Sequence, residues 1–350
     1  MTSLRRALTA FAVVFAMLPM VTPVARAQGS TYHVAVGGDD TGPGSESAPW
    51  GTIARGIRYL RPGDTVLIHG GDYYGASGFR QPGIPKATAS NPIRVLAAPG
   101  VRPVLHGVIN ITDPSYFVFD GINITYNSNT ASSYLLRITN GVGWTYRNAE
   151  IWGNTRISNV LINGTVDGEP RDWRFTGNCV HDIGAGPNPN NDHNMYVTPG
   201  YRSGPGIIER NLLFRAPNGN HIKAAGPGPS TGAANLKIRY NTMWKGSQGV
   251  LVAYGSHHVS LQRNLILNRW NGRTDNPAIR GHELTGDTNI AANNMGFGYR
   301  SVVKNTQADA GRLRNGGGNV TQNPMFDSTS TCAGFHPTAP AAQSYGHLAP

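Results

Sequence analysis

The tripeptide His221-Ile222-Lys223 combines two side chains that can carry or transfer a proton. On a β-strand, residues two positions apart lie on one face, so His221 and Lys223 would stand side by side if Ile222 faced a core. Only five of the 30 basic residues are lysines. A lysine acts as a base when burial or a neighbouring cation lowers its pKa from about 10.4. The pair is a candidate base with a proton partner, although a solvated surface lysine fits the same pattern.

A repeat from about residue 116 onward predicts the elements that position this tripeptide. Each period contains two strand-like runs separated by glycine-rich corners, which indicates stacked short strands. Asparagines recur in the first run of successive periods: Asn148, Asn178, Asn211, Asn241, Asn264 and Asn294. We expect their amides to hydrogen-bond from one repeat to the next, which is a structural role.

Aligning the second runs of successive periods, with Met195, Ile222, Val250 and Ile279 inward, places several polar side chains on one outward face. The candidate catalytic residues are Lys223, Arg280, His221, Tyr196 and His193, and the candidate substrate-binding residues are Asn194 and His282. Because rungs stack about 4.8 Å apart, Tyr196 would neighbour Lys223. Arg280 would lie two rungs, about 10 Å, beyond that lysine.

The N-terminal residues 1–27 have the pattern of a secretory signal peptide, with an apolar run after Arg5-Arg6 and a small-x-small site at its end. We therefore expect an exported, secreted protein with no membrane anchor. Removing three arginines with this segment lowers the formal charge from +11 to +8. That charge favours polyanions, but its dispersal disfavours a dedicated nucleic-acid binder. Cys179 and Cys332 could form a disulfide after export or stay separate.

The first elements and the repeat together resemble a known group of proteins. Tyr32–Val36 reads as a strand, Thr52 can cap a helix containing Ile53, Ile57 and Leu60, and Thr65–Ile68 starts the next strand. With the Asn-Pro-Met-Phe-Asp ending at 323–327, the chain resembles the pectate-lyase-like superfamily. The resemblance implies an all-β fold, a single-stranded right-handed parallel β-helix (solenoid) with a short N-terminal capping helix. The implied parts are a cap at 28–70, the β-helix at 71–325 and a tail at 326–350, in a monomer.

Lyases of this group cleave uronic-acid polysaccharides by β-elimination, so the resemblance implies an acidic polysaccharide as the substrate. The reaction needs a cation for the carboxylate, a base for the C5 proton and a proton for the leaving oxygen. Lys223 is the expected base, and Arg280 would bind the carboxylate through its planar guanidinium. His221, Tyr196 and His193 are the candidate proton partners.

Many such lyases use Ca²⁺, which prefers hard oxygen ligands. The candidate metal ligands are Asp167, Glu169 and Asp172, and nearby arginines could satisfy these acids instead. Two other functions stay open at this point. An inverting glycoside hydrolase would need grouped carboxylates, for which Asp182 and Asp192 are available. A non-catalytic glycan-binding protein would use Lys223 and Arg280 for affinity alone.

Overall fold

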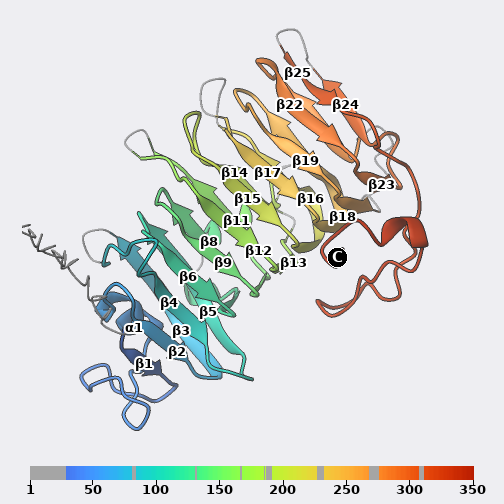
Figure 1. Ribbon diagram of the computed structural model, residues 1–350. Coiled ribbons are helices and arrows are strands. Elements are labelled where there is room, and N and C mark those ends of the chain that lie inside the picture. The colour runs from blue at the N-terminus through green and yellow to red at the C-terminus, as the bar shows by residue number, and fades with distance from the viewer. Residues whose placement is uncertain are drawn as a thin grey trace, which may run out of the picture.

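The computed structural model describes residues 29–80, 84–130, 132–165, 168–184, 186, 191–226, 232–267, 276–306 and 311–350. Parallel strands are stacked side by side from the N-terminal end of the molecule to its C-terminal end (Figure 1). They form two sheets, of 11 and 14 strands. The predicted signal peptide lies outside the described residues. No helix among the described residues is long and apolar enough to cross a membrane.

The 11-stranded sheet takes one strand from each successive repeat, and all of its neighbours are parallel. In spatial order its strands are β1 (Thr31–Val34), β2 (Thr65–Ile68), β4 (Ile93–Ala97), β6 (Phe117–Asp120), β9 (Thr145–Arg147), β12 (Trp173–Thr176), β15 (Gly206–Glu209), β17 (Leu236–Arg239), β19 (Ser260–Gln262), β22 (Gly286–Ala292) and β25 (Gly311–Asn315).

The 14-stranded sheet branches, because three long strands each pair with different neighbours at their two ends. These are β5 (Pro103–Thr112), β16 (Leu212–Ala224) and β18 (Thr242–Ala253). Short strands that pair with their first halves are β7 (Asn123–Thr125), β13 (Cys179–His181) and β20 (Leu265–Leu267). Two further short strands continue this part of the sheet: β10 (Glu150–Trp152) lies between β7 and β13, and β23 (Met295–Phe297) pairs with β20. The remaining strands are β3 (Gly71–Arg80), β8 (Tyr134–Thr139), β11 (Ser158–Asn163), β14 (His193–Thr198), β21 (Ile279–His282) and β24 (Val303–Thr306).

The prediction of a single-stranded right-handed parallel β-helix is wrong. The structure is an all-β protein with two extended parallel sheets, and it is not a single-stranded solenoid. Residues with left-handed backbone conformation break each repeat into separate strands. Asn148 (φ 54°) separates β9 from β10, and Asp182 (φ 55°) follows the end of β13. Because the chain changes direction at such positions, each repeat contributes to both sheets.

The predicted asparagine ladder is confirmed, with a change of membership at its two ends. Each amide nitrogen donates to the side-chain oxygen of the next asparagine at 2.9–3.1 Å, in the order Asn178, Asn211, Asn241, Asn264, Asn294 and Asn319. Asn148 does not belong to it, since its exposed amide donates to Asp120 and Ala149 occupies the equivalent position. The ladder satisfies buried polar groups that would otherwise be costly at a tight corner.

The predicted N-terminal helix is confirmed as α1 (Ile53–Tyr59), and the Thr52 hydroxyl accepts a hydrogen bond from the backbone nitrogen of Arg55. This N-cap satisfies one of the free N–H groups of the first turn. Ile53 and Ile57 are buried among the side chains of the hydrophobic core. The helix lies beside β1 and β2 at the N-terminal end of the stack (Figure 1).

The C-terminal tail returns along the outer face of the strands near β16 and β18 (Figure 1). Cys179 on β13 and Cys332 in the tail form a disulfide across 153 residues, with their Cα atoms 5.9 Å apart. Phe335 packs against Phe214 and Trp244, and η2 (Pro340–Ala342) follows it along the chain. η1 (Ser128–Thr130) is the other short 3₁₀ segment of the described chain. The tail therefore covers apolar side chains that point away from the main core.

Candidate functional site

The predicted inward set of the second strands is confirmed by the pairing register. Met195 pairs with Ile222, Ile222 with Val250, and Val250 with Ile279, and all four side chains are fully buried. Alternation then directs the residue after each of them to the outer face of the sheet. These outward residues are Tyr196 on β14, Lys223 on β16, Leu251 on β18 and Arg280 on β21, and we refer to them as the row.

The outward row brings three of the predicted catalytic residues together. Tyr196 pairs with Lys223, and the Lys223 ammonium lies 4.7 Å from the centre of the Tyr196 ring. Lys223 pairs with Leu251, which pairs with Arg280, so the two cations are two strands apart as predicted. Lys304 on β24 extends the row by one exposed residue.

Both central cations of the row are partly buried, and no described residue provides either of them with a counter-charge. Neither Lys223 nor Arg280 forms a salt bridge or hydrogen bond with another described residue, and the Arg280 Nε atom is buried without an acceptor. Burial, followed by the nearby Arg280 guanidinium, lowers the pKa of Lys223. Burial also lowers the pKa of Arg280. The lowered pKa of Lys223 shifts its equilibrium toward the neutral amine, which is the form that can accept a proton.

Two tyrosines that sequence reasoning missed complete this cluster. Burial, with smaller contributions from Tyr134 and Tyr254, raises the pKa of the Tyr196 phenol. Tyr254 also lies near Arg280, and its ring packs edge-on against His282 at 5.9 Å. Tyr134 is the first residue of β8, and Tyr254 follows β18 with φ 59°. Strand alternation does not decide side-chain direction at such ends, so the sequence carried little signal for either tyrosine.

His221 does not stand in solvent beside Lys223, which corrects the prediction. Its side chain is fully buried, and its Nδ1 atom lies 3.0 Å from the amide nitrogen of Asn194. Burial lowers the pKa of His221 to about 3, although a hydrogen bond with the Trp244 backbone raises it by a smaller amount. The irregular pairing between Ala216 and Asn220 immediately precedes it. The register is constant from Asn220 to Ala224, so the burial of His221 comes from the neighbours that cover it, Asn194 among them, and not from a change in strand alternation.

Asn194, predicted to bind substrate, is also fully buried and belongs to a second side-chain ladder. Asn159 donates to the Asn194 oxygen at 3.1 Å and to the backbone oxygen of His181 at 2.8 Å. Asn194 in turn donates to the backbone oxygen of Phe214 at 3.1 Å and to His221. The ladder uses the groups with which Asn194 would contact a substrate, so its assignment to substrate binding is wrong.

His193 lies near the row but is almost fully buried. Its Nδ1 atom accepts a hydrogen bond from the backbone nitrogen of Asn220 at 3.0 Å. Burial, and then the charge of Lys223, lowers the pKa of His193 to about 3. The ring is therefore neutral at pH 7 and carries its proton on Nε2. His193 is therefore better suited to holding β16 in place than to carrying a proton.

His282 is partly exposed on the same face of β21 as Arg280, as predicted. Its Nδ1 atom lies 3.0 Å from the Thr306 hydroxyl, and its Nε2 atom lies 3.4 Å from a carboxylate oxygen of Glu283. His282 therefore lies at one end of the row, and contacts at both ring nitrogens fix the orientation of its ring.

Two of the three predicted calcium ligands, Glu169 and Asp172, lie among the described residues. Asp167 lies outside the described residues, and the Glu169 Oε2 atom is buried without a hydrogen-bond donor. Asp172 has φ 55° and lies in the turn before β12. The only group of three possible ligands among the described residues is Cys179, His181 and Cys332, whose two sulfurs form the disulfide.

The two aspartates of the hydrolase alternative are both held by other groups. Hydrogen bonds from Arg215 and His181 outweigh burial and lower the pKa of Asp182. Asp192 is buried and accepts hydrogen bonds from the backbone of Ile157 and from the Asn218 amide. A general acid needs a raised pKa, so Asp182 is not prepared for that role, and the oxygens of Asp192 are already occupied by these hydrogen bonds.

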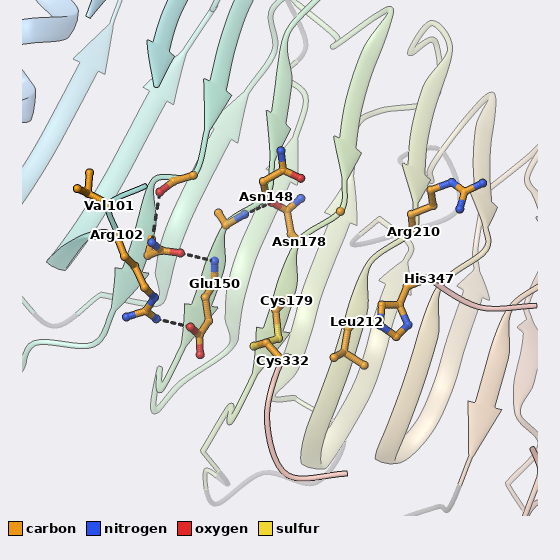
Figure 2. A pocket seen from close by; sticks show the side chains of 14 residues that line it. Val101, Arg102, Asn148, Glu150, Asn178, Cys179, Arg210, Leu212, Cys332 and His347 are labelled. Atoms are coloured by element: carbon orange, nitrogen blue, oxygen red, sulfur yellow. Dashed lines mark hydrogen bonds and ion pairs between the residues drawn. A yellow bond between two sulfur atoms is a disulfide. The ribbon is translucent and has the colours of Figure 1, made fainter. Parts of the chain in front are cut away.

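A pocket of about 500 Å³ lies away from the row, beside the disulfide and the C-terminal tail (Figure 2). Its two arginines are already engaged. Arg102 forms a salt bridge with Glu150, and Arg210 donates to backbone oxygens of Ala349 and Pro350. The pocket therefore offers a ligand less uncompensated charge than the row of Lys223 and Arg280 does.

Comparison with known proteins identifies the fold. No protein-family model and no curated protein matches the sequence. Among solved structures, the chain is similar to the pectate lyase Pel9A (16% identity, TM-score 0.52, covering 87% of this chain and 84% of that chain). It is similar to a glycoside hydrolase (8% identity, TM-score 0.58, 83% and 96% covered) and to XylC in its complex with xylose (11%, 0.57, 79% and 68%).

These identities are low, and the likenesses show the fold alone. The chain shares the extended parallel sheets of these solved structures, which agrees, at the level of the fold alone, with the resemblance seen in the sequence. The same fold carries both lyases and hydrolases, so the activity must be argued from the side chains of the row.

Proposed function

We propose that this protein is an exported polysaccharide lyase that cleaves a uronic-acid-containing glycan by β-elimination. The observation that carries the proposal is the pair Lys223 and Arg280, two partly buried cations on one outward row without a described counter-charge. Burying a cation without a partner is costly, and perturbed ionisable groups gather at functional sites. The similarity to a pectate lyase supports the same reaction class.

In the proposed reaction, Arg280 binds the substrate carboxylate with its planar guanidinium. Lys223 Nζ removes the C5 proton, the C–H electrons form a double bond between C4 and C5, and the bond from C4 to the glycosidic oxygen breaks. The Tyr196 hydroxyl, whose raised pKa keeps it protonated at neutral pH, gives its proton to the leaving oxygen. Proton return from the Lys223 ammonium, directly or through water, restores the starting state.

The experiment is incubation of the mature protein with a panel of acidic polysaccharides. A lyase produces an unsaturated uronate that absorbs in the ultraviolet, whereas a hydrolase produces reducing ends without that absorbance. Reducing ends without absorbance would replace the lyase proposal with the hydrolase alternative. Binding without either product would assign Lys223 and Arg280 to glycan affinity alone.

Calcium stays a candidate cofactor that Asp167, Glu169 and Asp172 would hold. Carboxylate oxygens are suitable donors, and the buried Glu169 oxygen without a hydrogen-bond donor is compatible with a cation at that loop. Treatment with a chelator, followed by calcium addition, tests this directly. Activity that is unchanged by both steps would remove calcium from the proposal.

A further inference from the structure

The row continues past Tyr196 toward the N-terminal end of the sheet. Tyr196 pairs with Leu161 on β11, and Leu161 pairs with Arg137 on β8. Neighbouring strands lie about 4.8 Å apart, so Arg137 lies three strands, about 14 Å, from Lys223. We refer to the whole line as the extended row: Arg137, Leu161, Tyr196, Lys223, Leu251, Arg280 and Lys304. It contains four cations and no acidic residue, and a face of this charge attracts an anionic chain along its length.

Arg137 is exposed, and the described residues hold its guanidinium at only one of its nitrogens. Its Nε atom donates to the side-chain oxygen of Asn163 at 3.3 Å, which orients the guanidinium. None of the salt bridges between described residues involves Arg137. A guanidinium binds a carboxylate through parallel hydrogen bonds, so the terminal N–H groups of Arg137 can hold one carboxylate of a ligand.

The two leucines of the extended row are covered, so the ligand does not need to contact them. Leu161 is 4% exposed and Leu251 is 6% exposed. Each of them lies between two long side chains on the neighbouring strands. Long side chains pack their stems against apolar neighbours and keep their polar ends in solvent. A ligand on this face therefore meets the ends of the basic and aromatic side chains.

The proposed reaction determines which part of the substrate lies near Arg137. One uronate binds with its carboxylate at Arg280 and its C5 proton at Lys223, and the oxygen that leaves its C4 atom receives a proton from Tyr196. Tyr196 lies one strand from Lys223, on the side of Arg137. The sugar that carries the leaving oxygen, and the chain attached to that sugar, therefore extend from Tyr196 toward Arg137.

Resting on the proposed function of the row, we propose that Arg137 binds the carboxylate of a second uronate, which belongs to the leaving chain. A sugar unit of an extended glycan is about as long as one strand spacing, so this uronate lies about two units beyond the bond that breaks. Lys304, which is exposed one strand beyond Arg280, offers a contact to the part of the chain on the other side. The enzyme then holds sugars on both sides of the reacting bond and cleaves within the chain.

The test measures elimination from size-fractionated oligogalacturonates and alginate oligomers of two to six units. We expect kcat/KM of the wild-type protein to rise at least tenfold once the leaving chain is long enough to reach Arg137, because a hydrogen bond between charged groups contributes at least that factor. Arg137→Ala should lower kcat/KM at least tenfold on hexamers and much less on dimers. Arg137→Lys retains the charge and should recover part of the loss.

Arg94→Ala is the matched control, since Arg94 is an exposed arginine on β4 of the other sheet. It removes the same charge and should keep the wild-type dependence on chain length. Urea unfolding of each variant identifies any loss of folding. If Arg137→Ala retains the rise with chain length, or if the wild-type protein has no such rise, the inference is overturned and the lyase proposal stands.

Failure of the proposed function is visible separately. If no oligomer yields an ultraviolet-absorbing product, the lyase proposal fails, and titration calorimetry with the same oligomers then tests Arg137 alone. Hexamer affinity that falls at least tenfold in Arg137→Ala and is unchanged in Arg94→Ala would support the contact with Arg137. Equal affinities of the two variants, or no measurable binding of any oligomer, would overturn it.

Discussion

Substitution of His221 tests whether this histidine has a structural role or takes part in the reaction. His221 is fully buried and accepts its hydrogen bond from Asn194. His221→Ala would leave one buried N–H of that amide without an acceptor and open a cavity of the size of an imidazole ring. An unsatisfied donor costs about 1–3 kcal/mol and loss of a large buried side chain about 2–5 kcal/mol. Allowing for partial collapse, we expect a loss of about 3–5 kcal/mol in the free energy of unfolding.

His221→Asn is the matched variant, since an asparagine can continue the ladder formed by Asn159 and Asn194. We expect it to cost less than about 1.5 kcal/mol, as in other substitutions that preserve most of the buried contacts. Urea unfolding followed by tryptophan fluorescence measures both variants. Elimination rates per folded molecule should stay within a few-fold of wild type for His221→Asn. A folded His221→Asn protein without turnover would refute the structural role and restore His221 to the reaction.

Three further predictions follow from the same contacts. Lys223→Ala should reduce the elimination rate by about 10²–10⁴-fold, the usual contribution of a general base. Lys237→Ala, on the exposed face of β17, is the control and should leave the elimination rate unchanged. Equal rates for the two variants would remove Lys223 from the mechanism. Reduction of the Cys179–Cys332 disulfide, which spans 153 residues, should lower the free energy of unfolding by about 2–5 kcal/mol, measured by urea unfolding with and without a dithiol. Burial alone would lower the pKa of His181, but hydrogen bonds to two carboxylates raise it above its ordinary value. The contribution of His181 to stability is therefore complete below the pKa of the unfolded chain, about 6.5, and is lost as pH rises through the pKa of the folded protein. His181→Gln should flatten that decline in unfolding free energy between neutral and alkaline pH, and an identical pH profile would contradict the assignment.

The parts of the fold that follow a regular sequence period could be predicted. The inward set from Met195 to Ile279 follows from a period of two, and the structure confirms it. The Thr52 cap and the asparagine ladder follow from local hydrogen-bonding chemistry, and both are present. The division into two sheets was missed, because it depends on single left-handed corner residues that a repeat pattern does not distinguish from strand residues.

The candidate site was predictable only where strand alternation continues without interruption. Lys223 and Arg280 follow fully buried inward residues, and their outward row is as expected. The burial of His221 depends on the neighbours that cover it, Asn194 among them. Tyr254 lies beyond the end of β18 with a left-handed backbone, and its phenol is close enough to Arg280 to interact with that charge. Such tertiary information is absent from the spacing of residues along the chain.

Several outward arginines form salt bridges with carboxylates, whereas the two central cations of the row do not within the described residues, and this contrast favours a ligand at the row. On the 11-stranded sheet, three outward arginines form salt bridges with carboxylates of neighbouring strands: Arg147 with Asp120, and Arg174 and Arg239 with Glu209.

On the 14-stranded sheet, Lys223 and Arg280 are partly buried, and the described residues provide no carboxylate for either. A purely structural row would gain from the pairing used on the other face, since a single acidic residue at position 251 would neighbour both cations. Leucine at that position gives neither charge a partner, and burial together with the Arg280 guanidinium lowers the pKa of Lys223. We therefore expect Leu251→Glu to raise the unfolding midpoint in urea while suppressing elimination, because the new carboxylate would occupy the cations that the substrate needs.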